Sequence, residues 1–113
     1  MARPVLLNWR LLLEERQRVS DGAGGFSETW VQLGQLWGEI QTRSVRATEV
    51  SAGGTALERH RILVRGAVEG DPRRPSAGQR FRNGSKAYTI DSVSENDASG
   101  KYLLCWTREE VLT

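Results

Sequence analysis

The sequence contains very few of the residues that build disulfides, metal centres and covalent catalysts. Its 113 residues include one cysteine, Cys105, one histidine, His60, and three prolines. A single cysteine excludes an intrachain disulfide, and one cysteine with one histidine cannot supply the three or four ligands of a zinc site. We therefore expect no metal and no cofactor, and nothing indicates export into an oxidising compartment.

Long hydrophobic runs and internal repeats are also missing. The apolar run Val5–Leu7 ends at Asn8, far short of a signal-peptide core or a membrane span. We expect a soluble cytoplasmic chain with no membrane partner. The length accommodates one hydrophobic core, so residues 1–113 are predicted to form a single domain.

The charge is nearly balanced. The sequence has sixteen Lys and Arg residues and fourteen Asp and Glu residues, which gives a net charge of +2. Positive and negative residues alternate along the chain. A protein whose main task is to hold phosphates usually carries a concentrated basic stripe, which is absent here. Fourteen of the sixteen basic residues are arginines, which suit ion pairs at interfaces.

Short segments rich in β-branched, aromatic and leucine residues alternate with turn clusters, a pattern typical of β-barrels and sandwiches. The first segment fits a helix or a strand, but the glycine-rich turn after it favours a hairpin. We predict an all-β fold, a small antiparallel β-barrel of about six strands with at most one short helix. The segments are Trp9–Val19, Phe26–Val31, Gln35–Thr42, Glu58–Arg65, Arg80–Arg82, Ala87–Val93 and Lys101–Trp106.

The connecting segments carry their own signals. Gly34, between two apparent strand segments, predicts a bulge or bend. The polar stretch Ser44–Leu57 predicts a long flexible loop. The prolines within Gly66–Gly78 exclude a regular element. Asn83-Gly84 predicts a tight hairpin turn, and residues 108–113 a charged tail.

No group of residues forms a recognisable catalytic centre, so we expect no enzyme and no catalytic residues. His60 shares the apolar face of its strand with Ile62 and Val64, which predicts a structural, hydrogen-bonded histidine. Cys105 lies in an apolar strand and is expected to be a small buried residue. The carboxylate pairs Glu14-Glu15 and Glu109-Glu110 are expected to be exposed and to point to opposite faces of a strand.

Two glycine- and aromatic-rich features allow a binding interpretation. Asp21–Gly25 lacks the Lys-Ser/Thr pair and the helix of a phosphate-binding loop, so we interpret it as a hairpin tip. The four tryptophans are expected in the core or at a subunit interface. The alternative is an OB-like module that stacks single-stranded nucleic acid on Trp9 or Trp30.

The order of several blocks resembles the head–tail joining family of tailed bacteriophages, the head-closure or stopper proteins of phages and of gene transfer agents. The resemblance covers residues 5 to 107. Its most specific parts are the D-G-x-G-G-x-x-E-T-W block from Asp21 to Trp30 and the H-R-I-x-V-R strand from His60 to Arg65. They are followed by G-x-R-F from Gly78 to Phe81.

The resemblance implies a structural connector subunit in a ring of six or twelve copies of itself. Such a ring lies between the portal-adaptor ring and the tail terminator, retains packaged double-stranded DNA and docks the tail. It would assemble in the bacterial cytoplasm and remain at the head–tail junction of the particle; the arginine-rich composition favours a gene transfer agent.

Charged residues are the candidates for the ring interface or the channel. In relatives a long loop points toward the channel, and here Ser44–Leu57 occupies that place, although S-G-R-E of relatives is replaced by R-S-V-R-A-T-E after Thr42. The arginine row of the fourth predicted strand and a loop pair complete the set. The candidates are Arg43, Arg46, Glu49, Arg59, Arg61, Arg65, Arg73 and Arg74.

Overall fold

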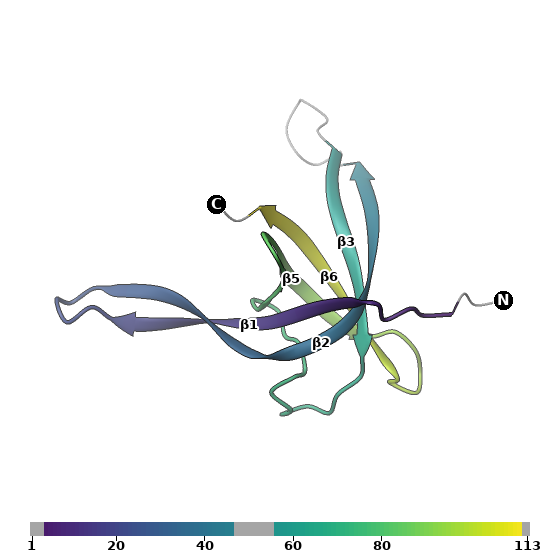
Figure 1. Ribbon diagram of the computed structural model, residues 1–113, viewed down its shortest axis with the longest axis horizontal. Helices are drawn as coiled ribbons and strands as arrows, with labels where there is room; N and C mark the ends of the chain where they lie inside the picture. The colour runs from purple at the N-terminus through teal and green to yellow at the C-terminus, as the bar shows by residue number, and fades with distance from the viewer. Residues whose placement is uncertain (1–3, 47–55, 112–113) are drawn as a thin grey trace.

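The computed structural model describes residues 4–46 and 56–111. Six antiparallel strands close into a barrel in the order β1-β2-β3-β6-β5-β4 (Figure 1). These residues contain no helix. They therefore include no helix that is long and apolar enough to span a membrane. The strands are β1 Trp9–Ser20, β2 Phe26–Arg46, β3 Ala56–Arg65, β4 Arg80–Asn83, β5 Lys86–Glu95 and β6 Tyr102–Val111. The all-β prediction is confirmed, and the first element is a strand.

Two predicted strands turn out to be one. β2 runs without interruption through Gly34, and the pairing register with β1 shifts between Leu13 and Glu14. Leu13 faces Gly34 and Glu14 faces Gln32, so Leu33 is the extra residue of a bulge next to the predicted glycine. A Cβ at Gly34 would lie 3.0 Å from Cγ of Arg73, so the absence of a side chain lets the 66–79 loop pack on β2.

Two predicted boundaries were wrong. Arg108 does not begin a tail, because β6 continues to Val111 and pairs with β5 as far as Lys86. The loop predicted from Ser44 is shorter, because Ser44–Arg46 belong to β2 and pair with Ala56–Glu58 of β3. Ladder hydrogen bonds override the polar composition of these strand ends. The rest of that loop, residues 47–55, lies outside the described residues.

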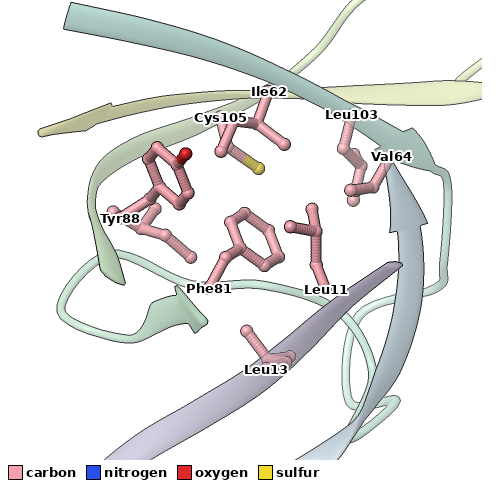
Figure 2. Packing of buried hydrophobic residues seen from close by; sticks show 9 residues of the cluster. Leu11, Leu13, Ile62, Val64, Phe81, Tyr88, Leu103 and Cys105 are labelled. Carbon is pink, nitrogen blue, oxygen red and sulfur yellow. The ribbon is translucent and has the colours of Figure 1, made fainter. Parts of the chain in front are cut away.

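The hydrophobic core fills the closed part of the barrel. Phe81 of β4 is fully buried at its centre, among side chains from β1, β3, β5 and β6 (Figure 2). Burial of each large apolar side chain contributes about 1.5–3 kcal/mol, so this cluster is the main source of stability. The cluster consists of Leu11, Leu13, Ile62, Val64, Phe81, Tyr88, Ile90, Leu103 and Cys105.

The tryptophans do not form the core. Trp9 is 47% exposed and Trp37 is 51% exposed, while Trp30 and Trp106 are half-buried. The expectation that tryptophan fills the barrel was wrong, because leucine, isoleucine and phenylalanine already fill the small interior. The large rings lie at the barrel ends and on its outer surface, which leaves the interface part of the prediction untested.

Two hairpins extend beyond the barrel. Residues 15–20 of β1 and 26–31 of β2 pair only with each other, and this segment, the β1–β2 arm, projects along the long axis of the molecule (Figure 1). The far end of β2 forms a second projection with the start of β3. The molecule consequently measures 58 × 42 × 25 Å.

The proline-containing loop at 66–79 is tied to the barrel. Nη1 of Arg74 donates to the carbonyl oxygen of Ala67 at 2.6 Å, and Pro75 is fully buried. Asp71 accepts a hydrogen bond from the backbone N–H of Arg73 at 2.8 Å. The loop is irregular, as predicted, but its polar groups are paired locally and it covers one side of the barrel.

Candidate functional site

His60 is a structural residue, as predicted. It is 5% exposed, and its Nδ1 lies 3.1 Å from Oγ1 of Thr42 on the neighbouring strand. Its ring meets Tyr88 edge to face with 5.2 Å between centroids, and its Nε2 lies 3.9 Å from Oε1 of Glu109. These contacts join β2, β3, β5 and β6 above the core and bring no serine or cysteine to the histidine.

Burial raises the pKa of Tyr88, and the Glu109 carboxylate raises it further by its charge and by a hydrogen bond. Glu109 also lies 3.4 Å from Nζ of Lys86. The carboxylate is therefore partly enclosed by polar partners, and the prediction that it is exposed was wrong. The arrangement stabilises neutral Tyr88 and closes the barrel between β5 and β6.

Cys105 is a buried structural thiol. Its side chain is inaccessible, and burial raises the pKa of the thiol to about 12, although the Arg74 guanidinium acts in the opposite direction. A reactive cysteine needs an exposed thiolate at neutral pH. The prediction of an inert core residue is confirmed.

Glu14 forms a buried ion pair at the base of the arm. The prediction that its carboxylate is exposed was therefore wrong. Nε of Arg80 donates to Oε1 of Glu14 at 2.7 Å, and both side chains are about nine-tenths buried. The ring of Trp30 covers the same guanidinium at 4.0 Å, and Arg16 lies 5.6 Å from that ring. The cluster ties β1, β2 and β4 together where the arm leaves the barrel.

The tip of the arm is a structured turn. Oδ1 of Asp21 accepts hydrogen bonds from the backbone N–H groups of Ala23 and Gly25, at 2.8 and 3.0 Å. Gly22 and Gly24 adopt positive φ angles of 79° and 84°, which glycine tolerates best. The carboxylate occupies the backbone donors that a phosphate would need, which agrees with the hairpin interpretation.

Three arginines meet in register across three strands. Arg43 of β2 pairs with Arg59 of β3, and Arg59 pairs with Arg108 of β6. Arg108 is also held by Asp91, with Nε 3.0 and 3.1 Å from the two carboxylate oxygens. Like charges directly opposite each other destabilise a sheet. Arg43, Arg59 and Arg108 are called the arginine row below, and they lie at the base of the β2–β3 projection.

The remaining predicted residues do not form one site. Arg61 lies over the ring of Trp106 at 5.5 Å, and Arg65 is exposed beside Trp37. Arg73 and Arg74 belong to the packed 66–79 loop on another side. Arg46 ends β2, and Glu49 lies outside the described residues. The residues at the described positions therefore divide between the β2–β3 projection, the barrel wall and the loop.

Sequence reasoning missed the contribution of Arg108 and of two exposed aromatic side chains. The sequence predicts a tail from Arg108 onward, so it gives no sign that Arg108 pairs with Arg59 across β3 and β6. Phe26 is 61% exposed and Trp37 is 51% exposed, although strand patterning suggests burial. Within the described residues no group of three or more His, Cys, Asp or Glu side chains is placed to hold a metal ion.

Two of the comparisons with known proteins give a match. The family model for the phage head completion protein matches residues 2–110. The chain belongs to this family. It is thus a structural head protein by family. No curated protein matches the chain.

A solved structure supports the assignment of the head completion protein at the level of the fold. One chain of the "Virion of native gene transfer agent (GTA) particle" is 40% identical, with a TM-score of 0.76. The match covers 98% of this chain and 100% of that chain. The resemblance seen in the sequence is therefore confirmed over nearly the whole length of the chain.

Proposed function

We propose that this head completion protein is a connector subunit between the portal-adaptor ring and the tail terminator. Six or twelve copies form a ring that closes the filled head, retains double-stranded DNA and docks the tail. The observation that carries the proposal is the match of 98% of the chain, at 40% identity, to a chain of a gene transfer agent virion. The particle is accordingly a gene transfer agent or a phage, assembled in the bacterial cytoplasm.

The shape of the subunit suits a ring. A ring needs two different, complementary surfaces on each copy, because every subunit contacts its neighbours head to tail. The elongated molecule offers such surfaces at the β1–β2 arm and at the opposite end of its long axis (Figure 1). The barrel supplies a rigid body between them.

The arginine row supports a role beside DNA. Arg43, Arg59 and Arg108 align at the base of the β2–β3 projection, and Arg46 follows on the same strand. Phosphate oxygens are the natural partners of guanidinium groups in a channel. The net charge of +2 keeps the total attraction small, which lets DNA pass without a strong salt-dependent trap.

Electron microscopy of purified particles tests the position and the copy number. We expect density for this chain as a ring of six or twelve copies at the head–tail junction. Density in the capsid lattice or at the tail tip would overturn the proposal.

A charge reversal tests the contact with DNA. We expect Arg59→Glu to lower the DNA content of assembled particles several-fold, measured by quantitative PCR after nuclease treatment. Lys101→Glu is the matched control, because Lys101 is an exposed cation just before β6, at the end of that strand away from Arg108. Equal DNA content in the two variants would show that the row does not retain DNA.

A further inference from the structure

The exposed large hydrophobic side chains lie mainly at the two ends of β1. Val19 and Phe26 lie at the tip of the β1–β2 arm, and Leu6, Trp9 and Trp37 lie where β1 begins. Eleven residue steps separate Trp9 from Ser20, or roughly 36 Å along an extended strand. The two apolar sets thus lie at opposite ends of one molecule, and Phe26 and Trp37 belong to different ends.

Beyond the contact of Trp30 with Arg80 at its base, the arm receives no strand pairing from the barrel. Its strands pair only with each other from residue 15 to 20 and from 26 to 31. A two-stranded hairpin alone is only marginally stable in water. Phe26 nevertheless stays 61% exposed, although the Arg18 guanidinium lies 4.3 Å from its ring centroid. Such an arm gains stability when its aromatic face is buried against another surface.

The opposite end of the molecule contains a hollow that fits an aromatic ring. It has a volume of about 360 Å³ and lies next to the start of β1. Leu36 and Trp37 supply apolar walls, and the exposed Arg65 supplies a cation that can lie against a ring. The lining residues are Leu7, Gln35, Leu36, Trp37 and Arg65.

The charges around these two surfaces are complementary. Glu28 shares the face of the arm with Phe26, since the two residues are two positions apart on β2. Its carboxylate is 54% exposed, and its contact with Arg16 is a long 3.5 Å. The hollow has Arg65 in its wall and the exposed Arg10 opposite Trp37. An arm that places Phe26 in the hollow brings Glu28 toward these arginines.

We propose that the occupant of the hollow is the arm of a second copy of this chain. Phe26 of one subunit inserts beside Trp37 and Arg65 of the next, and Glu28 pairs with the arginines there. The contact joins unlike surfaces, so its repetition produces a closed ring or a filament. The inference rests on the ring of the proposed function and names its subunit interface.

Disulfide trapping in assembled particles tests the contact. The double variant Phe26→Cys with Trp37→Cys should give, after oxidation, a ladder of cross-linked multimers on a non-reducing gel. An internal disulfide cannot form, because the two positions lie at opposite ends of β1 and a disulfide needs Cα atoms within about 7 Å. Native Cys105 is buried and does not contribute.

The matched control is Val68→Cys with Trp37→Cys, since Val68 is 76% exposed outside the arm. We expect at least tenfold less cross-linking from this control. Equal yields, or no ladder from particles in which microscopy shows the ring, would overturn the arm contact and leave the proposed function intact. Particles without a ring at the junction would overturn the proposed function instead.

If the cysteine variant does not assemble, an exchange of charges between Glu28 and Arg65 tests the same contact. Glu28→Arg alone and Arg65→Glu alone should each reduce incorporation of the chain into particles several-fold. The double variant should restore it, because the opposite charges meet again across the interface. Failure of the double variant to exceed both single variants would contradict the proposed contact.

Discussion

Nε of Arg80 lies 2.7 Å from Oε1 of Glu14, beneath the ring of Trp30. The two residues are 66 positions apart in sequence, and their pair joins β4 to β1 where the arm leaves the barrel. Because both side chains are about nine-tenths buried, each charge needs the other to compensate for the loss of its hydration.

Removal of one member of this pair should be costly. Arg80→Met removes the guanidinium that hydrogen-bonds the buried Glu14 carboxylate and leaves it only Arg82, whose Nη1 lies 3.9 Å from Oε2. We expect the free energy of unfolding to fall by about 3–5 kcal/mol. Urea denaturation followed by circular dichroism measures the loss. Arg16→Met, which breaks the exposed pair with Glu28, is the control and should cost about 0–1 kcal/mol. Similar losses in the two variants would show that enclosure of the Glu14 pair adds nothing.

Stability should decline in alkaline solution. Burial raises the pKa of Cys105 from 9.0 to about 12, so above pH 9 the unfolded chain releases a proton that the folded chain retains. The stabilisation is complete below pH 9 and is lost as the pH approaches 12, by up to about 4 kcal/mol. Tyr88 acts in the same direction, because its pKa is also raised.

Denaturation midpoints between pH 8 and 11 test this dependence. Cys105→Ala should weaken the decline, since the remaining titration is that of Tyr88 and of exposed groups. An unchanged slope in the variant would show that the thiol does not contribute.

A methyl group at Gly66 should disturb the barrel. A Cβ there would collide with the carbonyl oxygen of Gly100, and the backbone N–H of Gly66 donates to the carbonyl oxygen of Lys101 at 2.8 Å. We expect Gly66→Ala to destabilise the fold by about 1–3 kcal/mol. Val68→Ala in the same loop removes an exposed side chain and should change stability by less than about 0.5 kcal/mol.

Single-stranded DNA should not stack on the tryptophans. The Arg80 and Arg16 guanidinium groups contact the ring of Trp30, and the arginine row lies on β2, β3 and β6, away from Trp9 at the start of β1. We therefore expect no quenching of tryptophan fluorescence at sub-micromolar protein and moderate salt. Saturable quenching under those conditions would favour the OB-like alternative over the connector.

Local patterns predicted most of the fold. The turn at Asp21–Gly25, the alternation around Ile62 and the glycine at the bulge each act through neighbouring residues, so the sequence displays them directly. The prediction failed where distant partners decide. Glu14 is buried because Arg80 reaches it from another strand, and β6 continues past Arg108 because β5 pairs with it.

For the candidate site, too, local patterns were predicted from the sequence, while pairings between distant strands were not. Arg59 was found from its strand, but its alignment with Arg108 depends on the register between β3 and β6. The exposure of Phe26 depends on the arm extending past the end of β4, which no local pattern encodes. Surfaces that are completed by other subunits are thus the least visible in a single sequence.

β2 is one continuous strand of 21 residues that belongs to both projections. At about 3.3 Å per residue the contour of this curved strand is roughly 65 Å long, from the arm tip to the end that carries Arg43 and Arg46. A neighbour that holds the arm in a ring would therefore also constrain the other end of the same strand. The position of each copy's arginine end is then set by the adjacent copy, so the copies of a ring would shift together when DNA or a tail engages any one of them.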